Sequence, residues 1–132
     1  MRYIIDTHIL LWLIFDPDKI DAKKLELLKN PKNGIFVTNI SFWEVALKYG
    51  LGKLELQGLA PDQLQDVVKQ MGIEVHSVDP LSMSGVYKLA KMENHRDPFD
   101  RLIIWDCIQQ GYTLVSDDSK FKQYEDVGLK LI

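Results

Sequence analysis

Short apolar runs alternate with longer segments of helical periodicity along the whole chain. The short runs are rich in Ile, Val, Leu and Phe, which is typical of buried strands, whereas the longer segments repeat apolar residues at helical spacing. Turn residues such as Gly, Asn and Pro lie between the two kinds of segment. The pattern predicts strands over 3–5, 35–37, 73–75, 113–115 and 129–132, and helices over 10–15, 21–29, 41–49, 61–71, 81–92, 99–110 and 119–124.

The alternation of strands and helices indicates how these elements assemble. Each pair of successive strands is joined by a segment long enough for a parallel crossover, and parallel sheets are covered by helices on both faces. A chain of 132 residues has the usual length of one domain. We therefore expect a three-layer α/β/α fold around a central, mainly parallel sheet of four or five strands, in a single domain over residues 1–132.

Composition narrows the class of protein. Hydrophobic residues make up 46% of the chain and charged residues 27%, as in ordinary globular proteins. Cys107 is the only cysteine, and no apolar run approaches the roughly 20 residues of a membrane span. Because the opening segment reaches Asp6 before any apolar signal region, we expect a cytoplasmic protein without a membrane segment. The net charge of −3 implies that any contact with nucleic acid is local.

Four acidic residues occupy comparable places in the predicted elements. Asp6 and Asp118 follow strands, whereas Glu44 and Asp100 lie in the first turns of helices. These positions share one edge of a parallel sheet, where such folds bind ligands. Crowded carboxylates repel one another unless some are protonated or a cation lies among them, and hard oxygen ligands suit Mg²⁺ or Mn²⁺. Such an ion favours phosphodiester hydrolysis by activating water and neutralising phosphoryl charge.

Each acidic segment also has a purely structural explanation. The segment 41–44 reads S-x-x-E, a capping box in which Glu44 reaches back to the Ser41 backbone. The segment 97–100 places an N-cap Asp, a Pro at N1 and an acid at N3. Asp6 and the pair at 117–118 have the composition of turns. For any one segment capping is the better explanation, so only the joint pattern favours a metal site.

Five segments in a fixed order carry a resemblance to a known family. They read IDTHILLW at 5–12, SFWEVALK at 41–48, LGKL at 51–54, HRDPFDRLII at 95–104 and LVSDDSKF at 114–121. In this order they resemble the PIN-domain family and, within it, the VapC-type toxins of bacterial toxin–antitoxin pairs. The chain departs from the family pattern at Trp105, Asp106 and Cys107, where alanine is common.

The resemblance implies a PIN-like fold, a metal-dependent endoribonuclease and a set of site residues. It implies catalytic and metal-binding roles for Asp6, Glu44, Asp100 and Asp118, with Asp97 as an additional acid and Mg²⁺ or Mn²⁺ as the cofactor. Thr7, Ser41 and Ser116 resemble hydroxyl positions that support the acids. Lys48, Arg96 and Arg101 lie near the acidic motifs and are candidate contacts for RNA phosphates.

The expected partners are an RNA substrate, a cognate VapB-like antitoxin and a second copy of the chain. Apolar residues at Ile9, Trp12, Leu13, Trp43 and Leu47 exceed what one small core needs, which favours a homodimer face or an antitoxin groove. Two alternatives stay open within the family, namely an RNA-processing PIN nuclease outside toxin–antitoxin systems and an inactive PIN binding module. A phosphoryl-transfer or receiver-type domain is disfavoured, since the segment 6–8 lacks a D-x-D pair.

Overall fold

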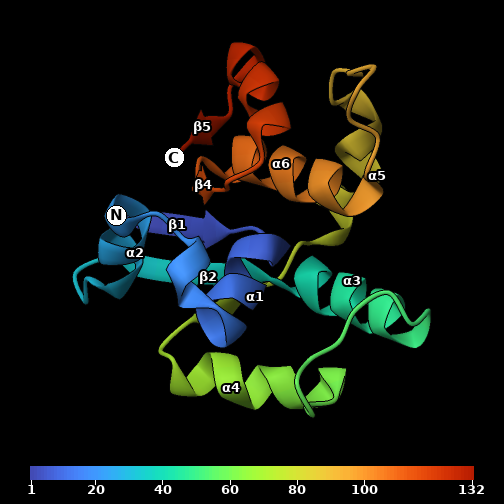
Figure 1. Cartoon of the computed structure of the whole chain (residues 1–132). Coiled ribbons are helices and arrows are strands. Elements are labelled where there is room, and N and C mark those ends of the chain that lie inside the picture. Colours follow the sequence, from blue (N-terminus) through green and yellow to red (C-terminus); the bar gives the residue numbers. More distant parts are fainter.

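The central sheet is entirely parallel, with strand order β3-β2-β1-β4-β5 (Figure 1). A computed structural model describes all 132 residues. The chain steps outward from β1 to β3 on one side and then adds β4 and β5 on the other. The order therefore reverses between β1 and β4, and a ligand site is expected at such a switch point. The strands are β1 (Arg2–Ile5), β2 (Gly34–Thr38), β3 (Glu74–His76), β4 (Thr113–Val115) and β5 (Lys130–Leu131).

Helices cover both faces of this sheet, so the predicted three-layer α/β/α fold is confirmed (Figure 1). None of the helices is long and apolar enough to cross a lipid bilayer. The α-helices are α1 (Thr7–Phe15), α2 (Ala22–Lys29), α3 (Asn39–Gly50), α4 (Leu64–Gln70), α5 (Pro80–Gly85) and α6 (Pro98–Gln110), and the 3-10 helices are η1 (Pro17–Lys19), η2 (Pro61–Gln63), η3 (Val86–Lys88) and η4 (Ser119–Val127).

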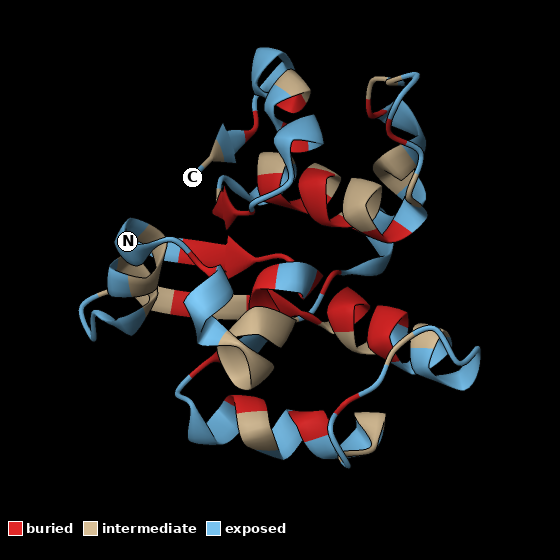
Figure 2. Cartoon of the chain, in the orientation of Figure 1, coloured by how far each residue is buried: buried red, intermediate tan, exposed pale blue.

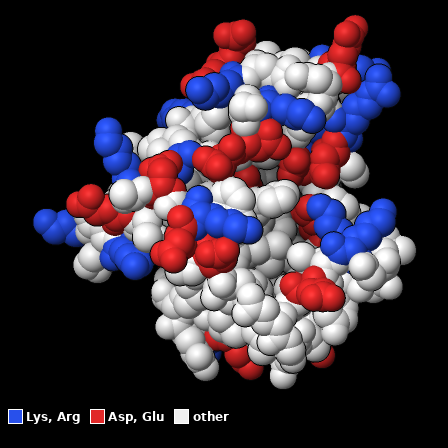
Figure 3. Space-filling view, viewed as in Figure 1, with Lys and Arg blue, Asp and Glu red and all other residues white.

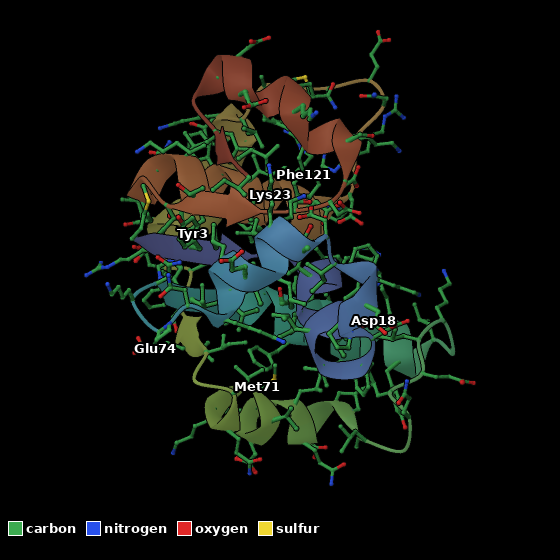
Figure 4. The ribbon with its side chains drawn as sticks, turned by 60° about the vertical axis from the view of Figure 1, so that its left-hand side comes forward. Tyr3, Asp18, Lys23, Met71, Glu74 and Phe121 are labelled. Atoms are coloured by element: carbon green, nitrogen blue, oxygen red, sulfur yellow. The ribbon has the colours of Figure 1, made fainter.

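Alternate residues of the strands supply two separate cores. Ile4 and Leu114 point to the face covered by α6 and η4, whereas Ile5 and Val115 point to the face covered by α1, α2 and α4. In Figure 4 Phe121 lies on the first side and Met71 on the opposite side, in the region of α4. Figure 2 shows buried residues along β1, β4 and α6 and mostly exposed residues on the outer surface of α4. Both faces of the sheet are therefore buried, as a parallel sheet requires.

The structure corrects some of the predicted helices. The helix expected over 81–92 is wrong beyond Lys88, because Leu89 is extended and buried in the core under α6. The helix expected over 61–71 begins as the 3-10 helix η2, and the one expected over 119–124 is the longer 3-10 helix η4. The helix expected at 41 begins two residues earlier, at Asn39. This earlier start moves Glu44 from the first turn of its helix to the second.

Candidate active site

Acidic side chains meet at the edge of the sheet where β1 and β4 end. Asp6 directly follows β1, Asp118 lies three residues after β4, and α3 and α6 bring Glu44 and Asp100 from either side. A band of acidic side chains crosses the face seen in Figure 3, with groups of lysine and arginine around it. In Figure 4 side-chain oxygens gather beside the labelled Phe121. The convergence predicted from the sequence is therefore present in the structure.

Asp6 lies at the bottom of this site and has only 2% of its surface exposed. One carboxylate oxygen caps α1 by accepting the Ile9 N–H at 2.8 Å, and the other accepts the Ser116 hydroxyl at 2.5 Å. Burial raises the pKa of Asp6 to about 6, although both hydrogen bonds act against that rise. Asp6 is thus the N-cap residue of α1 and at the same time a buried member of the acidic cluster.

Glu44 is equally buried, and the capping-box explanation for it is wrong. The N-cap position of α3 is Thr38, not Ser41, and the Thr38 side chain makes no capping hydrogen bond. The Glu44 side chain accepts the Thr7 hydroxyl instead of reaching back to the backbone. Thr7 donates its hydroxyl to Glu44 at 2.7 Å, so the Ser41 hydroxyl, 2.9 Å from Thr7, donates in turn to Thr7. Lys48 pairs with the second Glu44 oxygen. Both Glu44 oxygens therefore already have a donor from the protein.

Asp97 and Asp100 open α6 as the sequence predicts. Asp97 caps the helix by accepting the Asp100 N–H at 3.0 Å, with Pro98 at the first helical position. Burial raises the pKa of Asp100 to about 8, helped first by Asp97 and then by Glu44, Asp6 and Asp118. The raised pKa of Asp100 therefore reflects both its burial and the proximity of the other predicted acids.

Asp118 and Asp117 have different surroundings. Asp118 is exposed, its N–H donates to the Ser116 hydroxyl at 3.1 Å, and its carboxylate caps η4 through the Lys120 N–H at 2.9 Å. Asp117 instead pairs with Lys24 of α2 at 3.4 Å. Ser116 therefore links Asp6 and Asp118, whereas the side-chain contact of Asp117 is with Lys24.

A buried histidine contacts the acids from the loop before α6, a role that sequence reasoning missed. His95 is 4% exposed, and its Nε2 lies 3.2 Å from Asp100 Oδ2. Its Nδ1 lies 2.7 Å from the hydroxyl of Tyr124, which also accepts an Arg101 N–H at 3.0 Å. Burial lowers the pKa of His95 against the pull of Asp118 and Asp97. The HRDPFD segment brought His95 to attention, but nothing in the sequence indicated its contact with Tyr124.

The predicted RNA contacts occupy the rim of the site. Arg96 is exposed and lines a cavity of about 440 Å³ together with His95 and Arg101. Arg101 is partly buried and uses three N–H groups on Tyr124 and on the carbonyls of Leu89 and Ala90. Burial lowers the pKa of Lys48, but its hydrogen bond to Glu44 and the negative charges of Glu44, Asp97 and Asp100 together raise that pKa above its usual range. Lys48 and Arg101 are thus held by the protein, whereas Arg96 is free to reach a ligand.

The donor set fits a hard divalent cation. Two overlapping groups share Asp100, one with Glu44 and Asp97 and the other with His95 and Asp118, and within each group the ligand atoms lie within 4.8 Å of one another. The donor groups contain no sulfur ligand, since Cys107 lies on the buried face of α6 and packs in the core. Carboxylate oxygens suit hard divalent cations better than softer ions.

The apolar residues singled out from the sequence divide into two groups. Ile9 is fully buried, and Trp12 and Leu13 pack against the same core, so these three residues are not an open face. On α3, by contrast, Trp43 is 59% exposed and Leu47 is 43% exposed. Of these five residues, only Trp43 and Leu47 on α3 are exposed enough to contact a partner.

Comparisons with known proteins agree with this architecture. A family model described as PIN domain matches residues 3–127, whereas no curated protein matches the chain. The fold is similar to VapBC2 from Rickettsia felis bound to a DNA fragment from their promoter, at a TM-score of 0.69 and 23% identity over 100% of this chain and 98% of that one. The fold is also similar to VapBC-1 from nontypeable Haemophilus influenzae, at a TM-score of 0.69 and 18% identity over 100% of this chain and 97% of that one. For FitAcB from Neisseria gonorrhoeae the TM-score is 0.56 and the identity 15%, over 98% of this chain and 96% of that one. At these identities the likeness establishes the fold.

Proposed function

The chain belongs to the PIN-domain family, and from this premise we propose that it is an Mg²⁺- or Mn²⁺-dependent endoribonuclease and the toxin of a toxin–antitoxin pair. PIN domains are nucleases, so the coarse class is a hydrolase acting on nucleic acid. The observation that carries the finer proposal is the meeting of acids at Asp100, which belongs to two groups whose possible ligand atoms lie within 4.8 Å of one another. Burial, together with these acids, raises the pKa of Asp100 to about 8. The proposal treats residues 1–132 as one PIN domain.

The side chains have distinct tasks in this proposal. Asp6, Asp100 and Asp118 hold the ion, Glu44 binds it directly or through water, and Asp97 adds negative charge nearby. Ser116 orients Asp6, and Thr7, backed by Ser41, orients Glu44. A bound ion supplies positive charge that stabilises phosphoryl oxygens and makes water a better nucleophile. Lys48, Arg96 and Arg101 supply local positive charge for RNA phosphates, which the net charge of −3 does not provide.

The partners in the proposal are a VapB-like antitoxin and a second copy of the chain. The similar structures from Rickettsia felis and Haemophilus influenzae are VapBC structures, which supports an antitoxin partner. The exposed Trp43 and Leu47 on α3 support an apolar interface beside the acids. A small antitoxin-like reading frame next to the gene would separate the toxin from an RNA-processing nuclease. Expression of the wild type, but not of Asp100→Asn, is expected to slow growth unless that partner is supplied.

The first experiment compares RNA cleavage by wild type and Asp100→Asn with Mg²⁺, with Mn²⁺ and in EDTA. We expect cleavage only with a divalent ion and a loss of more than about 100-fold in the variant, since even outer-shell partners of metal ligands cost about 10- to 100-fold. Asp66→Asn is the matched control, because Asp66 is an exposed acid in the first turn of α4. Circular dichroism checks that each variant keeps the fold.

Three outcomes would contradict the proposal. Equal cleavage in EDTA would exclude the metal mechanism. Cleavage that survives unchanged in both Asp6→Asn and Asp100→Asn would reveal a contaminating nuclease. A wild type with no activity on RNA would leave the inactive binding module as the better explanation.

A further inference from the structure

We propose that His95 is a positioning residue that holds Asp100, and that Tyr124 and Arg101 fix the tautomer with which it does so. In this arrangement His95 donates its Nε2–H to Asp100 Oδ2 and is not itself a metal ligand. The inference rests on the proposed function only in treating Asp100 as a ligand of the ion. The tautomer itself can be measured without metal, RNA or nuclease activity.

The chain of contacts runs from α6 through the loop before it to η4 and back to α6. Asp100 Oδ2 lies 3.2 Å from His95 Nε2, and His95 Nδ1 lies 2.7 Å from the Tyr124 hydroxyl. Arg101 donates to the same hydroxyl at 3.0 Å. Tyr124 is fully buried and His95 is 4% exposed, so water competes little for these groups. Buried polar groups of this kind need a partner for each proton.

Arginine fixes the direction of the protons. A guanidinium can only donate, so the Tyr124 oxygen accepts from Arg101 and its own proton must go elsewhere. His95 Nδ1 is the one acceptor within reach. If Nδ1 carried a proton, in the other neutral tautomer or in the charged ring, the Tyr124 hydroxyl would face a donor and its proton would be buried without an acceptor. His95 Nδ1 therefore accepts, and the ring proton is on Nε2.

A protonated Nε2 has no lone pair for a metal ion. His95 lies within 4.8 Å of ligand atoms of Asp100 and Asp118, and that spacing alone would also suit a histidine ligand. With the proton on Nε2, only the carboxylates of that group offer lone pairs. The hydrogen bond from His95 holds Asp100 Oδ2 and so restricts the rotation of the carboxylate. Outer-shell hydrogen bonds of this type set the orientation of metal ligands.

The same arginine also holds the loop that carries His95. Arg101 donates to the carbonyls of Leu89 and Ala90 at 3.0 and 2.9 Å, where the chain leaves η3. The ring of His95 lies edge-on to the rings of Phe121 and Tyr124, with distances between ring centroids of 5.3 and 5.4 Å. The imidazole is therefore fixed by packing as well as by hydrogen bonds.

The direct test is nitrogen-15 NMR of the three histidine rings in the metal-free protein, with His8→Gln and His76→Gln used for assignment. We expect His95 to carry its proton on Nε2 and to keep it when Mg²⁺ saturates the protein. Tyr124→Phe removes the donor to Nδ1, and a mixture of tautomers is expected. A proton on Nδ1 in the wild type, or loss of the Nε2 proton when Mg²⁺ binds, would overturn the proposal.

The functional test measures Mn²⁺ affinity without RNA, from the electron paramagnetic resonance signal of free Mn²⁺. His95→Leu removes the donor and is expected to weaken Mn²⁺ binding about 10- to 100-fold. His95→Gln keeps an N–H near the position of Nε2 and should restore most of that affinity. His76→Gln is the control, because His76 also bonds an aspartate through Nε2, at 2.7 Å, but lies outside the site.

The two measurements keep the inference separate from the proposed function. Equal loss in His95→Leu and His95→Gln, with the fold retained, would make His95 a ligand and overturn the positioning role. Full Mn²⁺ affinity in His95→Leu would overturn it as well. If the wild type binds no Mn²⁺, the proposed function fails, and the NMR result alone decides the hydrogen-bond assignment.

Discussion

At the scale of single residues, the acids of the site differ in how the protein compensates their charge. Glu44 has a hydroxyl and an ammonium as partners, whereas Asp100 has one histidine donor and four acidic neighbours. Burial raises the pKa of Asp6 to about 6 and, with the neighbouring acids, that of Asp100 to about 8. These two aspartates therefore hold their protons to higher pH than an ordinary aspartate does.

This difference predicts how the stability of the metal-free protein depends on pH. The pKa of Asp100 rises from 3.8 to about 8 in the folded state and that of Asp6 to about 6, so the folded state binds more protons between these limits. The free energy of unfolding should therefore fall as pH rises from about 4 to about 8. Urea unfolding in EDTA measures this slope, and Asp100→Asn should flatten its upper part.

The control for this pH dependence is Asp66→Asn, which should keep the wild-type slope. Saturating Mg²⁺ should reverse the decline at high pH, because ion binding displaces the protons. Metal-free stability that rises between pH 6 and 8 in the wild type would contradict the assignment.

The residue scale also shows where sequence reasoning stops. Asp6, Glu44, Asp100 and Asp118 could be singled out because each lies beside a predicted strand or helix end, and parallel topology brings such ends together. The contact of His95 with Tyr124 joins residues 29 positions apart through side chains, and no periodicity encodes it. The Glu44–Lys48 pair has helical spacing, but its role depended on where α3 begins.

At the scale of elements, strands were predicted more accurately than the ends of helices. The strand over 113–115 matches β4, and the others differ by one residue at one or both ends. Continuous apolar runs are easy to recognise because they follow directly from burial on both faces of the sheet. The helix ends depended on tertiary contacts instead. The chain leaves its helix before Leu89 because that residue enters the core and its carbonyl accepts Arg101. Neither partner is close in sequence.

A buried pair between β3 and α6 gives the prediction at this scale. Asp106, fully buried, receives its one hydrogen bond from His76, while its other oxygen has no partner. His76→Ala would leave a buried carboxylate with no partner and should cost about 3 kcal/mol. Asp106→Ala should cost about 1 kcal/mol, since the His76 side chain is partly exposed and water can replace the lost acceptor.

Urea unfolding of the two single variants and the double variant measures this asymmetry. The double variant should lose less free energy of unfolding than the sum of the two single losses, because it removes the buried Asp106 carboxylate together with its partner His76. His8→Ala is the control, since His8 is exposed and such surface changes usually stay within about 0.5 kcal/mol. An Asp106→Ala cost larger than that of His76→Ala would contradict the buried-charge explanation.

At the scale of the whole molecule, charge is distributed unevenly around a net value of −3. Lysine and arginine groups surround the acidic band in Figure 3. A cavity of about 280 Å³ beside Glu44 includes Lys48 and Lys53, and the cavity of about 440 Å³ beside His95 includes Arg96. An RNA strand that crosses the acids in the proposed function would therefore meet cations on both sides. Its affinity should depend on these few contacts and not on the net charge.

The salt dependence of RNA binding tests this arrangement. In an Asp100→Asn background, which prevents cleavage, the logarithm of the affinity for a single-stranded RNA should fall linearly with the logarithm of salt concentration. Lys53→Gln and Arg96→Gln should each reduce that slope by about 0.7, the contribution of one phosphate contact on a single strand. Lys69→Gln on α4, exposed on a helix that packs on the other face of the sheet from α6, should leave the slope unchanged. If only one of the two site variants changed the slope, the strand would enter the acids from that side alone, and if neither did, RNA would not follow the path between the two cavities.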